Sequence, residues 1–409
     1  MIALAIGVLL GLRLAGLGFD GDPLAVLVDA PERLREIADR RGPVVGISLL
    51  AWLAAFGLSM AVDRERVGRT AARLLALSVA YLPLVLLAGA ALEPSVAAER
   101  LLLMLGAPAL AAATLAALGG YRALAFACAA TVLASAADLI AGSPLTQLSL
   151  AGPNPAAGHR YYGIGNELEA ILVVLTLAGT GAALTAFSPR GWGKCCERGP
   201  AALLVVAAVL SFVFAYGRYG ADVGAAITLP LGACVAAALL VERPRLALLA
   251  LLVPLPALAI LAAADLLTGS DAHLTSTVLQ ADGGRDVLAV LGRRLREAGE
   301  SFGRPLLIAG LPFTIAAAIL AWLGRGRIAA WLRPVPAFRA GLAGALAATL
   351  VGTVANDSGA LLLELGAAYL VAFLGFAWAE GDSRRSQHYP SYDTGNAGSG
   401  GLSCEDRYP

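Results

Sequence analysis

Long apolar stretches recur along almost the whole chain, and they constrain its fold more than any other feature. Each stretch has roughly 17–22 residues, the length that an α-helix needs to cross a hydrocarbon core of about 30 Å. Charged residues make up only 14% of the chain and lie in short runs between these stretches. The alternating polarity that a transmembrane β-barrel requires is not seen. The sequence therefore predicts an all-α, polytopic transmembrane helical bundle.

About twelve spans are expected, and the charged runs between them set their limits. The apolar run Leu101–Ile140 divides into two helices because Gly119, Gly120 and Arg122 mark a turn. The expected spans are residues 2–18, 44–62, 74–92, 101–118, 123–140, 167–187, 200–216, 222–241, 246–265, 305–323, 340–355 and 359–378.

The arginines in the short loops predict the orientation of the bundle. Alternate loops are rich in arginine, and such loops face the cytoplasm. This places both chain termini in the cytoplasm. Lys194 is the only lysine in the chain, and alanine is abundant. This composition suggests a GC-rich bacterial source, and so the bacterial inner membrane. The arginine-rich loops contain Arg64, Arg66, Arg69, Arg73, Arg122, Arg190, Arg198, Arg243, Arg245, Arg325, Arg327, Arg333 and Arg339.

Three segments fall outside the expected spans. Residues 19–43 and 266–304 form long outer loops of a transmembrane domain that covers residues 1–378. The first loop contains a candidate surface helix at Pro31–Arg41, and the second contains an amphipathic helix near residues 287–296. That amphipathic helix would either lie in the outer membrane interface or cover the bundle. The tail at residues 379–409, rich in Gly, Ser, Tyr and Asp, is expected to be a disordered cytoplasmic segment.

Four polar motifs fall on the predicted outer side, and three of them lead directly into spans. They are Gly158–Glu169, Tyr216–Gly224, Asp271–Thr275 and Asn356–Gly359. One interpretation is structural, because helix N-termini prefer Asn, Asp and Ser caps and acidic first turns. Asn166 with Glu169 resembles a capping box, Asp222 would cap the next span, and Asp357 or Ser358 the last.

The other interpretation is one shared, outward-facing site, because several helix N-termini that converge bind anions. The candidate catalytic groups are Glu167, His273 and Asp222, and no metal site is expected. Glu364 lies deeper in the last span and is expected to face a cavity or an arginine. The candidate substrate-binding residues are Arg160, Arg218, Tyr162, Asn166, Asn356 and Asp357.

The motifs also support a resemblance. Arg160–Glu167, Gly220–Gly224 and Asn356–Gly359 resemble a functionally uncharacterised family of bacterial polytopic membrane proteins, which implies a shared site without naming its chemistry. A looser, topological likeness is to O-antigen ligase and polymerase proteins of the cell envelope. That likeness implies a long outer loop carrying His273 and an outward-facing Arg218, both acting on a polyprenyl-diphosphate-linked glycan.

Three functions remain open at this point. The first is an envelope glycan transferase that acts on a lipid-linked, anionic substrate, with Arg160 and Arg218 holding the diphosphate. The second is a secondary transporter or flippase in which Glu167, Asp222, Asp357 and Glu364 bind a coupling ion. The third is a membrane scaffold without catalysis. The lipid bilayer is the expected partner, the net charge of +1 gives no sign of nucleic-acid binding, and no cofactor is expected.

Overall fold

The computed structural model describes residues 31–153, 162–187, 193–268, 292, 296, 298–303, 310–356 and 358–381. All regular structure within these residues is helical, and no strand occurs among them. The longer elements are α3 (Pro31–Arg41), α4 (Ile47–Val62), α5 (Arg69–Leu92), α6 (Val96–Leu101), α7 (Ala107–Leu118), α8 (Gly120–Ile140), α9 (Pro144–Leu148), α10 (Asn166–Phe187), α11 (Gly193–Ala215), α12 (Val223–Leu240), η5 (Pro244–Leu252), α13 (Pro254–Thr268), α17 (Leu311–Leu323), α18 (Arg325–Leu332), α19 (Pro336–Ala355) and α20 (Gly359–Gly381). Short π-helical turns η1 (Gly42–Gly46), η2 (Arg64–Gly68) and η3 (Leu102–Gly106) join some of them.

Ten described helical segments are long and apolar enough to cross a membrane. An eleventh follows if α17 and α18, which meet at a bend of 75°, are counted as one span. The predicted all-α polytopic bundle is therefore confirmed, and the chain is a multi-pass membrane protein. The expected first span, residues 2–18, lies outside the described residues.

The division of the run Leu101–Ile140 into two helices is confirmed. α7 ends at Leu118 and α8 begins at Gly120. Gly119 and Gly120 both have positive φ values, 64° and 44°, which glycine adopts without steric penalty. The first of these two spans begins earlier than expected, because α6 already starts at Val96 with Ser95 as its N-cap.

The region after residue 310 differs from the expectation. The predicted span 305–323 is described only from Gly310, and α17 ends at Leu323. The arginine-rich segment that follows was expected to be a loop, but it contains α18. This helix forms because Leu332 is buried and Ile328 packs against the core, while its arginines stay exposed. At the other end of the chain, the predicted helix Pro31–Arg41 is present as α3 and continues into the α4 span.

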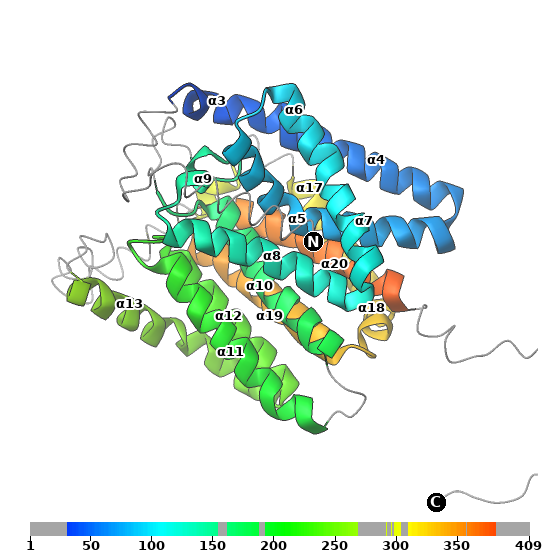
Figure 1. Cartoon of the computed structure of the whole chain (residues 1–409). Helices are drawn as coiled ribbons and strands as arrows, with labels where there is room; N and C mark the ends of the chain where they lie inside the picture. Colours follow the sequence, from blue (N-terminus) through cyan, green and yellow to red (C-terminus); the bar gives the residue numbers. More distant parts are fainter. Residues whose placement is uncertain are drawn as a thin grey trace, which may run out of the picture.

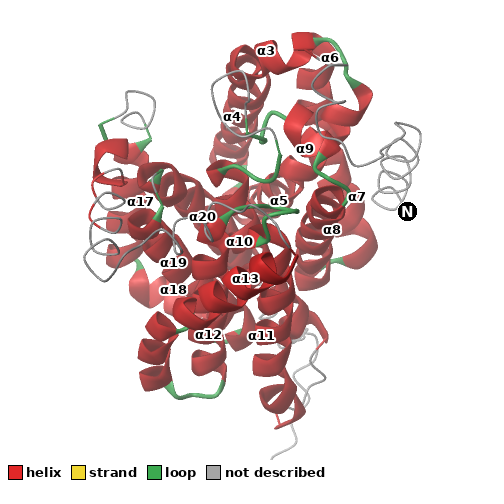
Figure 2. Cartoon of the chain, turned by 90° about the vertical axis from the view of Figure 1, so that its left-hand side faces the viewer, coloured by secondary structure: helices red, strands yellow, loops and turns green. Residues whose placement is uncertain are grey.

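The helices form one bundle with α10 near its middle, where it contacts α8, α19, α20, α11 and α12 (Figures 1 and 2). Figure 1 shows α11, α12 and α13 side by side on one flank, and α3, α4 and α6 on the opposite flank. α12 and α19 approach closely because Gly232 and Gly344 face each other, so that a Cβ on either would collide with the backbone of the other. Small residues at such contacts are typical of membrane helix pairs.

Two ends of the bundle can be distinguished by their side chains. At one end, α5 begins beside the C-terminus of α20, where Arg73 donates to the Ala379 carbonyl at 2.8 Å and pairs with Glu380 at 2.7 Å. A cation at a helix C-terminus is favourable because the macrodipole is negative there. The turn between α7 and α8, one of the segments predicted to be basic, lies at this end too, because a Cβ on Gly120 would be 3.1 Å from the Glu380 carboxylate. At the opposite end, α10, α12 and α20 begin, and their first turns meet. The candidate site is at that end.

Candidate functional site

The first turns of α10 and α20 are joined by side-chain hydrogen bonds. Asn166, the first residue of α10, donates from Nδ2 to Ser358 Oγ at 2.8 Å, just before α20. Asn356, at the end of α19, donates to Asn166 Oδ1 at 3.4 Å and to Glu169 Oε2 at 3.3 Å. Two motifs that lie 190 residues apart in the sequence are therefore in direct contact.

Glu169 extends this network to α12. Its side chain is fully buried, and its Oε1 accepts from Thr228 Oγ1 at 2.8 Å. Asp222 is also buried and close enough to Glu169 for their charges to repel. A Cβ placed on Gly224 would lie 3.0, 3.1 and 3.3 Å from side-chain atoms of Asp222, Asn356 and Glu169, so glycine at this position lets the three groups meet.

We refer to Asn166, Glu169, Asp222, Thr228, Asn356 and Ser358 as the polar cluster. It extends from the half-buried Asn166 and Ser358 to the buried Glu169, Asp222 and Asn356. Three of the four sequence motifs contribute to it. Buried polar groups are normally hydrogen-bonded, and those of the cluster are largely bonded to one another across helices.

Helix capping accounts for only part of the cluster, at Asp222 before α12 and at the Asn356–Ser358 turn before α20, where Asn356 Oδ1 accepts from the Ser358 N–H at 3.3 Å. Asp222 caps α12, because its Oδ1 accepts from the Gly224 N–H at 2.8 Å. Glu169 does not complete the capping box expected with Asn166, since its carboxylate oxygens accept from Thr228 and Asn356 on neighbouring helices. Asn166 likewise reaches Ser358 on another helix. The polar groups therefore join helices as well as cap them.

Backbone contacts hold the two glycine-rich motifs together beside the cluster. The Ile164 N–H donates to the Gly220 carbonyl at 2.9 Å, and the Gly163 N–H donates to Ser143 Oγ at 3.1 Å. Gly163 has φ of 80°, and a side chain there would collide with Gly220. Glycine is therefore required at Gly163 both for its conformation and for this approach.

Arg41 and Glu167 form an ion pair at the more exposed edge of the cluster. Arg41 Nη1 lies 3.3 Å from Glu167 Oε1, and its Nη2 donates to the Gly152 carbonyl at 2.8 Å. Both side chains are about a third exposed (35% and 33%), so the pair itself adds little stability. The pair orients the Glu167 carboxylate. It also places the Arg41 guanidinium beside Glu167, the residue that follows Asn166 of the polar cluster.

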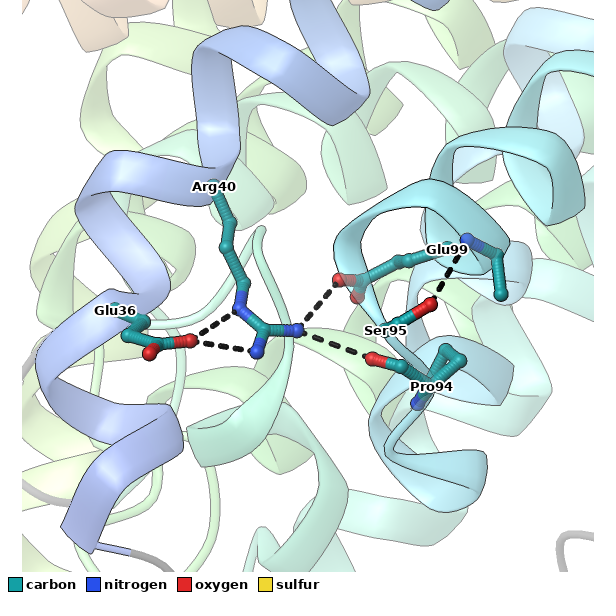
Figure 3. A network of polar contacts seen from close by, with 6 residues as sticks. Glu36, Arg40, Pro94, Ser95 and Glu99 are labelled. Carbon is teal, nitrogen blue, oxygen red and sulfur yellow. Dashed lines mark hydrogen bonds and ion pairs between the residues drawn. The ribbon is translucent and has the colours of Figure 1, made fainter.

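The preceding residue, Arg40, binds different partners and fixes α3. Figure 3 shows its guanidinium between Glu36, which accepts at 2.6 and 2.9 Å, and the start of α6, where Glu99 accepts at 3.4 Å and the Pro94 carbonyl at 3.1 Å. Glu99 is fully buried there. This network attaches α3 to the α5–α6 connection, and so it holds Arg41 in place.

The remaining candidate residues divide into two groups. Tyr162 is half-buried next to Gly163, and Arg218 is exposed on the turn between α11 and α12. Arg160, His273 and Asp357 lie outside the described residues, as does nearly all of the predicted amphipathic helix at residues 287–296. The predicted disordered tail, residues 379–409, also lies outside them except that α20 continues to Gly381.

Thr228 and Arg41 were not among the candidate residues from the sequence. Thr228 lies within an apolar span, where a single threonine is usually a core residue, and no local pattern marks it. Arg41 belongs to a different part of the chain from the motifs. The packing of α3 brings Arg41 to Glu167, and the packing of α12 brings Thr228 to Glu169.

Glu364 is separate from the polar cluster. Its carboxylate lies against Gly310 at the start of α17, so closely that a side chain on Gly310 would collide with it. An anion at a helix N-terminus is favourable because the macrodipole is positive there. Glu364 therefore lies against the N-terminus of α17. The sequence had suggested a cavity or an arginine as its neighbour.

Within the described residues, no group of three or more His, Cys, Asp and Glu side chains is arranged to hold a metal ion. No family model matches this chain, and searches of curated proteins and of solved structures found no match either.

Proposed function

We propose that this protein is a membrane transferase that acts on the polar head group of a lipid-linked, anionic substrate at the polar cluster. The observation that carries the proposal is the position of Glu169. It is a fully buried carboxylate, bonded to Thr228 and Asn356, where the first turns of three spans meet. The ends of membrane spans lie at the depth of lipid head groups. A site there is reached most directly by a substrate held in the bilayer.

Helix N-termini and arginines near the polar cluster supply the positive partners for an anionic head group, opposite in charge to Glu169 and Asp222. The N-terminal N–H groups of α10, α12 and α20 point to this end of the bundle, and such ends attract phosphate groups. Arg41 and Arg218 add cations near the cluster, and Arg160 belongs to the same motif as Glu167. Arginine binds phosphate oxygens in a bidentate manner, which suits a diphosphate.

In the proposed reaction, a hydroxyl of the acceptor attacks the sugar carbon that is bonded to the diphosphate. A new carbon–oxygen bond forms, and the bond to the diphosphate breaks, with its electron pair leaving on the lipid diphosphate. A carboxylate or imidazole removes the hydroxyl proton. Glu167 is the best placed described candidate, since Arg41 orients it at the exposed edge, and His273 and Asp222 are the alternatives.

Ion-coupled transport is the second candidate function. It is favoured by the same buried pair, because Glu169 and Asp222 with neutral oxygen ligands would suit a proton or cation. Transport sites usually lie near the membrane midplane between broken helices, whereas this cluster lies in the first turns of three spans. A scaffold protein is the third possibility, in which the cluster only joins helices.

The test uses purified protein in nanodiscs, with a polyprenyl diphosphate and inorganic pyrophosphate as probes. A ligand at 100 times its dissociation constant stabilises the folded state by about 2.7 kcal/mol, so binding is measured as a thermal shift. We expect both probes to stabilise the wild type and Arg327→Gln, and to bind Arg218→Gln at least about tenfold more weakly, because this substitution removes a cation from the anion site. Arg327 is the matched control because it is an exposed arginine on α18, near the C-terminus of α20 at the opposite end.

The binding result is followed by a turnover assay. A lipid-linked oligosaccharide is supplied with the protein, and release of free polyprenyl diphosphate is measured. Equal binding by Arg218→Gln and the wild type, or no binding by the wild type, would contradict the proposal. Proton or sodium uptake into proteoliposomes that Glu169→Gln abolishes, without diphosphate release, would favour transport instead.

A further inference from the structure

An apolar groove lies on the flank of the bundle between α11, α12 and the η5–α13 segment. Its volume is about 360 Å³, which is within the range of ligand-binding pockets. The residues that define it are Ala207, Ser211 and Ala215 of α11, Ala226 and Ala233 of α12, and Leu261 of α13. All six are buried and form its floor, whereas Leu204, Phe212 and Ile260 of its lining are 40%, 40% and 65% exposed, so the groove opens on the surface of the bundle.

We propose that this groove binds the hydrocarbon chain of the lipid whose head group occupies the polar cluster. The proposal rests on the proposed function, since it names the second half of the same substrate. The groove lies within segments that are long and apolar enough to span a membrane, so it is surrounded by hydrocarbon. A lipid chain is the apolar ligand available at that depth.

α12 contributes to both places on different faces, because Thr228 bonds to Glu169 whereas Ala226 and Ala233 line the groove, and the two faces meet at the first turn of the helix. Asp222 caps this helix, and Ala226, which lines the groove, follows four residues later. At 1.5 Å per residue, the two positions are about 6 Å apart along the helix axis. Ser211 closes the space between the helices at this level by donating to the Ala225 carbonyl at 3.2 Å. A lipid with its head at Asp222 would therefore have its first chain atoms at the groove.

Aromatic side chains connect the groove to the turn between α11 and α12. Phe212 lines the groove and stacks on Tyr216, with ring centroids 5.0 Å apart and an interplanar angle of 15°. Tyr216 in turn contacts Tyr219 edge-on at 5.2 Å, on the turn that carries Arg218. Tyrosine is typical of the membrane interface, because its ring is apolar and its hydroxyl is polar.

The length of the groove suits a chain in one leaflet. Its lining on α12 extends from Ala226 to Cys234, which is eight residues or about 12 Å. One leaflet contributes about 15 Å of hydrocarbon. The groove therefore covers most of the depth of the leaflet that begins at the polar cluster, and it would hold the part of the chain nearest the head group.

The first test varies both the chain and the groove. The probes are a long-chain polyprenyl diphosphate, geranyl diphosphate and inorganic pyrophosphate, measured by thermal shift in nanodiscs. Ala208→Phe fills the groove from α11, where Ala208 is exposed, so the larger side chain does not overpack the core. Val205→Phe is the matched control, because Val205 is 62% exposed on the same helix and does not line the groove.

We expect Ala208→Phe to weaken binding of the long-chain diphosphate at least about tenfold and to leave pyrophosphate binding unchanged, with Val205→Phe binding both normally. Unchanged long-chain binding by Ala208→Phe would overturn the groove proposal. If Arg218→Gln still weakens pyrophosphate binding in that case, the proposed function stands. If the wild type binds none of the three probes, the proposed function fails and this inference with it.

The second test leaves the groove unchanged. Cys234 is half-buried in the groove lining, so a lipid-soluble diazirine, which forms a reactive carbene on irradiation, should label it and its neighbours, and peptide mass spectrometry locates the label. We expect the long-chain diphosphate to slow labelling of Cys234 at least about fivefold, and phosphatidylglycerol at the same concentration to have no effect. Equal protection by both lipids would show an ordinary bilayer lipid in the groove and would overturn the proposal.

Discussion

Asp138 provides the sharpest test of how the candidate site is supported. It is buried at the end of α8 and accepts three hydrogen bonds, from Leu145 N at 2.9 Å, Thr146 N at 2.8 Å and Thr146 Oγ1 at 2.6 Å. These bonds hold the start of α9. In the segment around α9, Ser143 Oγ accepts a hydrogen bond from the Gly163 N–H, and the Gly152 carbonyl accepts one from Arg41. This segment therefore holds Gly163 and Arg41 in place beside the polar cluster.

The magnitude of an Asp138→Ala substitution follows from these bonds. The Thr146 hydroxyl can rotate to another acceptor, but the two backbone N–H groups cannot. Each buried donor left without a partner costs about 1–3 kcal/mol, so we expect a loss of about 2–6 kcal/mol of unfolding free energy. Thr146→Val removes one bond and should cost about 1 kcal/mol.

Ser135→Ala is the control for this prediction. Ser135 lies one turn earlier on the same helix, is fully buried, and its hydroxyl has no hydrogen-bond partner among the described residues. Its substitution should change stability by less than about 0.5 kcal/mol. Unfolding is followed in mixed micelles against the fraction of dodecyl sulfate. A loss for Asp138→Ala within about 1 kcal/mol of that for Ser135→Ala would refute the argument.

Two further predictions concern packing and orientation. Gly344→Ala should destabilise the bundle by about 1–3 kcal/mol, because the new Cβ meets the Gly232 backbone, whereas Gly375→Ala, with nothing within 4 Å, should be neutral or slightly stabilising in the same unfolding assay. In a background in which the five native cysteines are replaced, Arg218→Cys should react with a membrane-impermeant maleimide in intact cells, and Arg325→Cys only after permeabilisation. The opposite pattern would reverse the predicted orientation.

The sequence by itself determined the class of fold and most of the span positions. The length of a hydrophobic run is a local property of the sequence. In a membrane it is nearly enough to predict a helix, because structures that leave backbone N–H and C=O groups without hydrogen bonds are excluded from hydrocarbon. The turn at Gly119 and the helix at Pro31–Arg41 were also predictable from local signals. The α18 helix was not, because its formation depends on burial of Leu332 against the core.

Tertiary structure alone decided which polar residues meet. Asn166 and Ser358 are 192 residues apart, and no periodicity in either segment specifies their hydrogen bond. Thr228 becomes a partner of Glu169 only because glycines let α10, α12 and α19 approach closely. The motifs marked helix ends correctly, since capping is local. The buried network that joins those ends depends on how the helices pack, and packing depends on side chains distant in the sequence.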